Sequence, residues 1–204
     1  MPPTDAPRVA ATVLTCAGRE AVLAQTLANL RRSDWGEEPT VFRDLGAGPD
    51  HMGRQKVAAR QLLTEALGRP WEYLLFFEDD IDVNDHLRHN LTTWGPLVTR
   101  KAQFASLYAP GGMPFVARGP RVAVPDPAYF YGAQGMLLSR ACVGHVLAHY
   151  EEAEGFIDIR CRYLAAPLGP FFCHAPSLVQ HVGFASVWGG GFHQAVDFDR
   201  GYRA

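Results

Sequence analysis

Apolar and polar residues alternate in blocks along the first part of the chain, and the blocks predict alternating strands and helices. An apolar run over 8–15 is typical of a strand, and the segment after it spaces apolar side chains as one face of a helix does. A short strand at 40–42, a helix over 54–67 and a strand over 73–78 continue the series. A Gly-Arg-Pro sequence at 68–70 ends the second helix. This alternation predicts βαβ units and therefore a parallel sheet flanked by helices.

The rhythm changes after the third strand. The elements expected there are a helix capped by Asp85 that carries Leu87, Leu91, Trp94 and Val98, strands at 104–108 and 122–124, a helix capped by Ser139 that runs to about Tyr150, a helix near 158–166, and a strand near Phe171. We expect an α/β fold with a mixed, mainly parallel sheet. The length suits one domain over 1–204, with about 8–100 as one half and about 101–204 as the other.

Composition and charge are those of an ordinary globular protein and exclude several classes. The 204 residues are 48% hydrophobic and 20% charged, and the net charge of -2 gives no overall basic field for nucleic acid. The first residues lack the charged and apolar regions of a signal peptide, and no apolar run reaches membrane-spanning length. The four cysteines are far apart without a CxxC pair, which is typical of reduced thiols. We therefore expect a cytoplasmic protein without a membrane partner.

The strand over 73–78 ends abruptly in acidic residues. Its apolar run indicates a strand buried on both faces, and it is followed at once by Glu78, Asp79, Asp80 and Asp82. Ligands of open α/β sheets bind beyond the carboxyl ends of the strands. Carboxylates crowded there repel one another and lose hydration, a cost that a bound cation offsets. The pattern predicts a divalent metal site at the centre of an α/β enzyme.

Three interpretations of these acids compete. Asp80-x-Asp82-x-Asn84 opens like an EF-hand calcium loop, but Asp85 and Leu91 stand where that loop requires Gly and Glu, so we reject it. Alternatively, the acids end the strand and cap the following helix. The third interpretation is a metal bridge to a diphosphate, because hard carboxylate oxygens suit Mg²⁺ or Mn²⁺.

The segment 75–82, with Asp85 close behind, resembles the metal motif of GT-A glycosyltransferases. It is most similar to the Glu-Asp-Asp form of N-acetylglucosaminyltransferase I and its relatives. The resemblance implies that Asp80 binds the metal directly. It also implies that Glu78 and Asp79 face the sugar, the ribose or groups around the metal.

Two further segments carry the same resemblance. Thr15, Gly18 and Arg19, before a helix, are similar to the first nucleotide-contacting turn of these enzymes. The segment 176–183, with Ser186, is similar to their Pro-Ser-Leu-x-Gln-His-x-Gly-x-x-Ser sequence. The family match implies a GT-A (Rossmann-like) catalytic domain over 1–204, whose first half binds a nucleotide-sugar and whose second half binds the acceptor.

Cationic and imidazole side chains near these segments are the other candidates for the donor site. Arg19, Arg54 and Lys56 are candidates to face the nucleotide or diphosphate, although Arg54 and Lys56 fit solvated helix charges equally well. His181 is the candidate second metal ligand, and the alternative is a hydrogen-bonded structural histidine. His193 follows a Gly-rich tail that closes over the donor in this hypothesis.

The second half supplies the candidate base and sugar contacts. If the reaction inverts the anomeric centre, Asp158 is the best-placed carboxylate to accept the acceptor's proton, and helix N-cap is its rival role. Cys161 stands where the family pattern often has Leu, so that match is incomplete. Glu154 and Asp126 are reserve bases. The segment 129–135, which includes Gly132 and Gln134, resembles the glycine-containing stretch that lines the donor sugar.

The sequence thus predicts a metal-dependent glycosyltransferase, hexosyl- or N-acetylhexosaminyl-, that uses Mn²⁺ or Mg²⁺ and moves a sugar from a nucleotide-sugar to a hydroxyl. UDP-sugars are the family default. The acceptor stays open among a glycan, a peptide, a metabolite and a modified nucleobase. A nucleotidyltransferase is the first alternative, although its usual glycine-rich loop is missing after residue 15. A non-catalytic nucleotide-sugar-binding protein is the second, although it would leave the acids without a cation.

Overall fold

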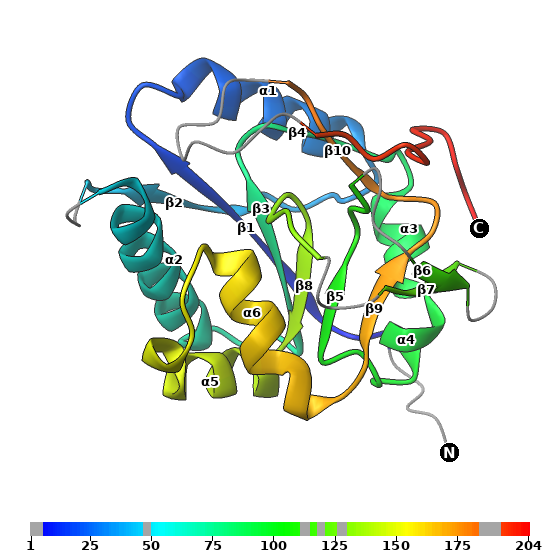
Figure 1. The fold of residues 1–204 in the computed structure, drawn as a ribbon. Helices are drawn as coiled ribbons and strands as arrows, with labels where there is room; N and C mark the ends of the chain where they lie inside the picture. Colours follow the sequence, from blue (N-terminus) through cyan, green and yellow to red (C-terminus); the bar gives the residue numbers. More distant parts are fainter. Residues whose placement is uncertain (1–5, 47–49, 111–114, 118–120, 126–129, 184–192) are drawn as a thin grey trace.

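The computed structural model describes residues 6–46, 50–110, 115–117, 121–125, 130–183 and 193–204. An eight-stranded sheet forms its middle layer, in the spatial order β2-β1-β3-β8-β5-β9-β7-β6 (Figure 1). All but β8 and β7 run in one direction, so the expected mixed, mainly parallel sheet is confirmed. These strands are β1 (Val9–Cys16), β2 (Thr40–Asp44), β3 (Tyr73–Glu78), β5 (Phe104–Ser106), β6 (Phe115–Ala117), β7 (Val122–Pro125), β8 (Met136–Ser139) and β9 (Phe171–His174).

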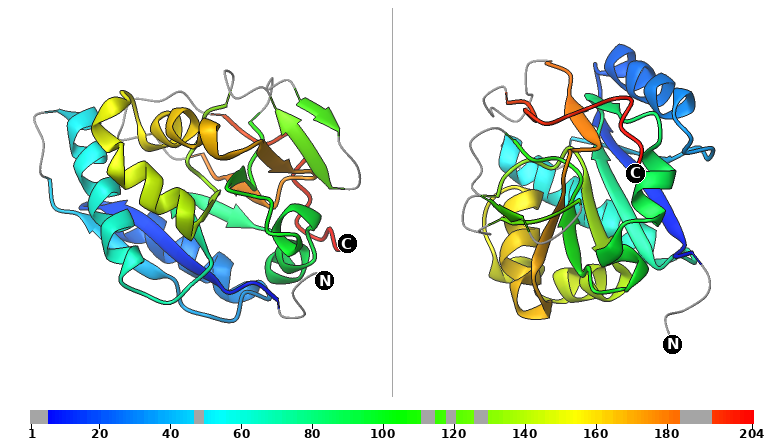
Figure 2. Two further views of the ribbon diagram at one scale, coloured as in Figure 1. Left: turned by 90° about the horizontal axis from the view of Figure 1, so that it is seen from below. Right: turned by 90° about the vertical axis from the view of Figure 1, so that its right-hand side faces the viewer.

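Helices cover both faces of the sheet (Figure 2). One face carries α2 (His51–Leu67), α5 (Arg140–Ala148) and α6 (Ile157–Ala165), and the other carries α1 (Glu20–Arg32), α3 (Leu87–Thr92) and α4 (Gly95–Val98). Short 3-10 turns occupy Tyr150–Glu152 and Ala166–Leu168. None of the helices in the described part of the chain has the length and apolar character needed to span a membrane.

Strand β3 joins the two hydrophobic cores. Leu74 and Phe76 pack in the core under α2, α5 and α6, whereas Leu75 and Phe77 pack in the core under α1 and α3. All four are at most 1% exposed, which confirms the strand buried on both faces. Because successive side chains of a strand point to opposite faces, an uninterrupted apolar run is required here.

Four short strands were not predicted from the sequence: β4 (Ile81–Val83), β6, β8 and β10 (Val179–His181). Runs of three or four residues carry too little periodicity to identify, and β4, β8 and β10 pair with residues far away in the chain. The cap assigned to Asp85 was wrong, since α3 begins after His86 and Asp85 instead accepts a hydrogen bond from Arg32 Nε. The Ser139 cap is confirmed, because its hydroxyl accepts from the Cys142 backbone N–H.

Beside the main sheet, β4 pairs antiparallel with β10, and the C-terminal segment 193–204 lies along this pair (Figure 1). The amide of Gln180 donates to the Ala195 carbonyl and accepts from the Ala195 N–H, both at 2.9 Å. The buried Asn84 amide nitrogen donates to the carbonyl oxygens of residues 199, 200 and 202. These bonds fix where the segment, and with it His193, reaches the carboxyl ends of the strands.

Replacing Asn84 by Ala tests this anchor. The variant removes three hydrogen bonds to the carbonyls of residues 199, 200 and 202, each of which keeps another donor, and we expect the free energy of unfolding to fall by roughly 1–3 kcal/mol, the net worth of several hydrogen bonds. Chemical denaturation measures the change. Gln61→Ala, which removes an exposed amide on α2, is the matched control and should change stability by less than about 0.5 kcal/mol. Equal losses in the two variants would contradict the anchoring role.

Candidate active site

The site begins where β1 and β3 end side by side. Their parallel register places Leu14 opposite Glu78, so the next residues, Thr15 and Asp79, are neighbours. The Thr15 hydroxyl donates a hydrogen bond to Asp79 Oδ2, and Arg19 Nε donates to Asp79 Oδ1 at 2.8 Å. Arg19 and Asp79 are 60 residues apart in the chain. The turn after β1 and the acidic cluster after β3 therefore form one site.

Arg19 and His181 are the cations beside Asp80. Arg19 Nη2 lies 2.7 Å from both Asp79 Oδ1 and Asp80 Oδ2, and His181 Nε2 lies 3.3 Å from the same Asp80 oxygen. All four side chains are nearly buried. The negative charges of Asp79 and Asp80 are therefore balanced by protein side chains, so these two residues do not need a bound metal to offset their repulsion.

The pairing of β4 with β10 brings His181 to this position. Its register sets His181 opposite Ile81, one residue beyond Asp80, and the Val182 N–H donates to the Asp80 carbonyl at 3.0 Å. His181 Nδ1 donates to the His193 carbonyl at 3.0 Å, which leaves Nε2 directed at Asp80. An imidazole oriented by a bond at one nitrogen is ready to bind an ion or a ligand at the other.

The electrostatics of the cluster follow from burial and these pairs. Burial alone would raise the pKa of Asp80, but His181 and Arg19 together lower it. Burial would lower the pKa of His181, yet Asp80 raises it. The pKa of Glu78 is raised well above its usual value by burial and by the charges of Asp80 and Asp158. The two carboxyls therefore shift in opposite directions, because Asp80 has cationic partners whereas Glu78 has carboxylate neighbours.

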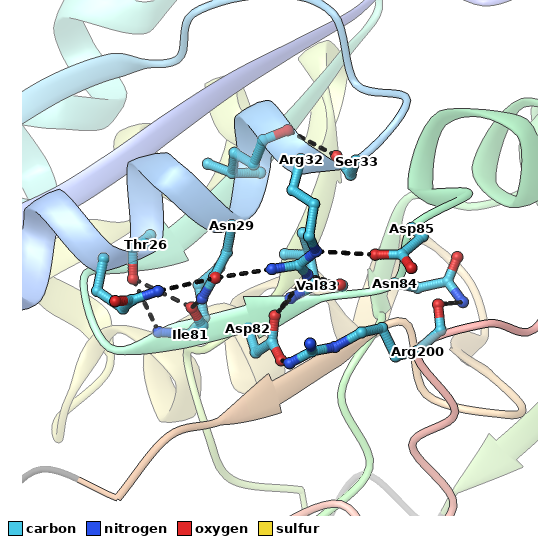
Figure 3. Close-up of polar contacts among 12 residues, drawn as sticks. Thr26, Asn29, Arg32, Ser33, Ile81, Asp82, Val83, Asn84, Asp85 and Arg200 are labelled. Carbon is cyan, nitrogen blue, oxygen red and sulfur yellow. Dashed lines mark hydrogen bonds and ion pairs between the residues drawn. The ribbon is translucent and has the colours of Figure 1, made fainter.

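Helix α1 supports the acidic turn from behind (Figure 3). The Thr26 hydroxyl donates to the Asp79 carbonyl at 2.7 Å and accepts from the Ile81 N–H at 3.0 Å. The Asn29 amide donates to the Ile81 carbonyl at 2.9 Å. These bonds satisfy the backbone between β3 and β4, so the carboxylates of this turn are held on a fixed loop.

The remaining acids have a separate, structural role. Asp82 accepts from Arg32 Nη2 at 2.8 Å and also pairs with Arg200, and Arg32 Nε reaches Asp85 at 3.0 Å (Figure 3). This network ties α1, β4 and the C-terminal segment together. The acidic run thus divides into Glu78, Asp79 and Asp80 at the site and Asp82 beyond it.

Gly132 and Gln134 lie at the opposite side of the site. Gln134 Nε2 donates to Glu78 Oε2 at 2.8 Å, and the Gly132 N–H donates to Asp158 Oδ2 at 2.6 Å. Gly132 has a φ of 104°, and a Cβ there would stand 2.7 Å from Gln134 Oε1, so only glycine fits. Tyr129, at the start of this segment, falls outside the described residues.

Asp158 is a buried carboxylate in the first turn of α6. The N-cap position belongs to Phe156, so the rival role as N-cap is not observed. Burial raises the pKa of Asp158, although hydrogen bonds from the Gly132 and Ile159 N–H groups act against the shift. Of the reserve bases, Glu154 is exposed and Asp126 lies in a part of the chain that the structure does not describe.

His193 and two tyrosines complete the site. The Tyr108 hydroxyl lies 2.6 Å from His193 Nδ1, and the His193 ring packs edge-on against Tyr131 with centroids 5.0 Å apart. Tyr108 is fully buried, whereas Tyr131 is 37% exposed. No sequence signal indicates a site role for Tyr108, which ends the strand expected over 104–108. Thr26 and Asn29, which support the acidic turn, were also not predicted. Their polar side chains on the buried face of the first helix were the signal that could have identified them.

Two predicted donor contacts lie outside this cluster. Arg54 Nη2 pairs with the buried Asp44 carboxylate at 2.8 Å, at the end of β2. Lys56 pairs with Glu151, in the 3-10 turn that follows α5. Apart from Arg54 and Lys56, the structure brings the candidate site residues together. They are Thr15, Arg19, Glu78, Asp79, Asp80, Gly132, Gln134, Asp158 and His181.

The side chains of the site could bind one divalent metal ion, with most of its ligands supplied by a bound phosphate and water. Within the described ranges, no group of three or more His, Cys, Asp or Glu side chains is arranged to hold a metal. Asp80 Oδ1 is nevertheless buried without a hydrogen-bond partner among the described residues, and His181 Nε2 is close by. One carboxylate oxygen and one imidazole nitrogen fit Mn²⁺ or Mg²⁺ whose other ligands are phosphate oxygens and water.

A Gly132→Ala substitution tests the packing of this site. The added Cβ meets the Gln134 amide and the Tyr108 ring at a positive φ, so we expect a loss of about 1–3 kcal/mol in the free energy of unfolding. Gly144→Ala, inside α5 where a Cβ meets nothing within 4 Å, should instead stabilise by about 0.5–1 kcal/mol. A neutral Gly132→Ala variant would contradict this packing.

The pair Asp80–His181 gives a pH signature in protein stripped of metal. NMR titration should give His181 a pKa above its usual value of about 6.5, and Asp80→Asn should move it below that value, because burial then dominates. The pair's contribution to stability should be lost as pH rises through the raised pKa of His181, and also as pH falls through the lowered pKa of Asp80. The exposed His51 serves as the reference, and an unshifted His181 would refute the pairing.

Comparison with known proteins gives the fold but no family. No family model matches the chain, and no curated protein does. A glycosyltransferase involved in the glycosylation of the major capsid of PBCV-1 is similar in structure, with a TM-score of 0.51 and 13% identity, over 87% of this chain and 94% of that one. The 4-diphosphocytidyl-2C-methyl-D-erythritolsynthase from Anaerococcus prevotii DSM 20548 is also similar in structure, with a TM-score of 0.51 and 12% identity, over 88% of this chain and 94% of that one. The chain therefore has a GT-A-like, Rossmann-like α/β fold.

Proposed function

We propose that this protein is a glycosyltransferase that moves a sugar from a nucleotide-sugar, with a UDP-sugar as the expected donor, to an acceptor hydroxyl with inversion. One observation carries the proposal: a buried cluster of Arg19, Asp79, Asp80 and His181 at the carboxyl ends of β1 and β3, with the buried Asp158 near enough for both it and Asp80 to raise the pKa of Glu78. The structural likeness to a glycosyltransferase supports the same class.

In this proposal the two sides of the site bind different parts of the donor. Thr15, Asp79 and the Arg19 guanidinium lie where the nucleotide and its diphosphate bind in α/β sheets, beyond the strand ends. Glu78, Gly132 and Gln134 face the sugar. Burial and the neighbouring carboxylates raise the pKa of Glu78, and both its carboxyl and the Gln134 amide beside it offer polar contacts to sugar hydroxyls.

The reaction then needs one base and one leaving-group stabiliser. The acceptor oxygen attacks the anomeric carbon, the bond from that carbon to the diphosphate oxygen breaks, and the acceptor's proton passes to the Asp158 carboxylate. Arg19 stabilises the negative charge that grows on the diphosphate. The Gly132 N–H holds Asp158 in place, which fixes the direction from which the acceptor approaches.

A divalent metal, Mn²⁺ or Mg²⁺, belongs to the proposal as a cofactor. Asp80 Oδ1 and His181 Nε2 would hold it, and it would supply further charge stabilisation to the leaving diphosphate. The hydrogen bond from His181 Nδ1 to the His193 carbonyl keeps Nε2 directed at that position.

A nucleotidyltransferase is the second candidate, because the likeness to a synthase of a diphosphocytidyl compound is equally strong. A buried carboxylate on the sugar side favours hydroxyl activation and therefore sugar transfer. A binding protein without catalysis is the third candidate. The objection that it would leave the acids without a cation is removed, because Arg19 pairs with both Asp79 and Asp80.

Asp158→Asn separates these classes. The variant should bind a UDP-sugar as the original protein does, while donor hydrolysis or transfer falls by about 10²- to 10⁴-fold, the usual contribution of a general base. Donors are screened as UDP- and GDP-sugars with Mn²⁺, by calorimetry for binding and by release of the nucleoside diphosphate for turnover. Glu154→Gln, an exposed carboxylate before the same helix, is the control and should keep full activity.

Each alternative has a distinct result in this assay. Nucleotide-sugar binding without turnover in the original protein would indicate a binding protein. Release of pyrophosphate from a nucleoside triphosphate, with no hydrolysis of any nucleotide-sugar, would indicate a nucleotidyltransferase. Unchanged turnover in Asp158→Asn would remove Asp158 as the base.

A further inference from the structure

Arg19 contacts the same carboxylate that is the candidate metal ligand. Its guanidinium bridges Asp79 Oδ1 and Asp80 Oδ2 at 2.7 Å, and its side chain is 10% exposed. Asp80 is therefore already paired with a cation through one oxygen, while its other oxygen has no partner among the described residues. A divalent ion at Asp80 and a guanidinium at Asp80 are like charges a few ångströms apart.

We propose that Arg19 is an exchangeable counter-ion, which couples metal binding to nucleoside diphosphate binding. With neither bound, the guanidinium holds Asp79 and Asp80. A diphosphate offers the same guanidinium paired oxygens of higher charge, so Arg19 moves from Asp80 to the phosphate and the carboxylate becomes available to the metal. The proposal rests on the proposed function, because it assigns diphosphate and metal to this site.

The contacts of Arg19 explain why the exchange requires the nucleotide. A buried guanidinium without an anion is costly, so the metal alone must displace it against that cost. Arg matches phosphate oxygens with two parallel hydrogen bonds, so the diphosphate replaces the lost pairing. Asp79 keeps its bond from Thr15 throughout, which holds the acidic turn while Arg19 moves.

Metal binding without any donor tests the exchange directly. We expect Arg19→Gln to bind Mn²⁺ alone about tenfold more tightly than the original protein, a typical size for coupling between sites. The original protein should bind Mn²⁺ weakly alone and about tenfold more tightly with UDP, and Arg19→Gln should lose that enhancement. Electron paramagnetic resonance of free Mn²⁺ measures both affinities, and thermal unfolding confirms that each variant is folded.

Two further variants separate charge from packing. Arg19→Lys keeps the positive charge and should keep the weak binding of Mn²⁺ alone. Arg32→Gln removes a guanidinium from Asp82 and Asp85, outside the site, and should leave Mn²⁺ binding unchanged. A folded Arg19→Gln protein that binds Mn²⁺ alone no better than the original overturns the exchange, and the proposed function stands. An original protein that binds no Mn²⁺ even with UDP overturns the metal site itself.

Discussion

The antiparallel pairing of β4 with β10 completes the charged cluster of the candidate site, because it joins the two segments that carry Asp80 and His181. The first of these segments leaves the central strand β3, and the second comes from a part of the chain a hundred residues later. Without this pairing, Asp80 would lose one of its two cations, and His193 would have no fixed position beside it. The acidic turn alone is therefore not a site.

Charge compensation inside the site is the second constraint. Buried carboxylates persist only when cations or hydrogen-bond donors lie beside them, and here Thr15, Arg19 and His181 supply both. The same contacts that make the cluster stable without a ligand also decide how a ligand enters it. A phosphate or a metal has to exchange with an existing pair, which makes binding at this site a competition among charges.

Some of the acids that look equivalent in the sequence have different roles. Glu78, Asp79 and Asp80 reach the site, while Asp82 is turned to Arg32 and Arg200 and holds α1 against the C-terminal segment. Alternation along one extended strand would place Asp80 and Asp82 on the same face. The chain instead bends at Asp79 and Asp80, between β3 and β4, so Asp82 belongs to the second strand and points elsewhere, and no count of acids in the sequence reveals where that bend falls.

The sequence by itself determined the order of the main elements, the two-faced burial of the strand over 73–78 and the candidate cluster at its end, because these depend on local periodicity and on a continuous apolar run. The short strands β4, β8 and β10, the partners of Asp82 and Asp85, and the place of Tyr108 were decided by tertiary structure alone. Each depends on a residue far away in the chain: His181 opposite Ile81, Arg200 beside Asp82, His193 beside Tyr108. Local sequence carries no record of such partners, since a pairing of three residues becomes stable only when the rest of the fold holds both strands in place.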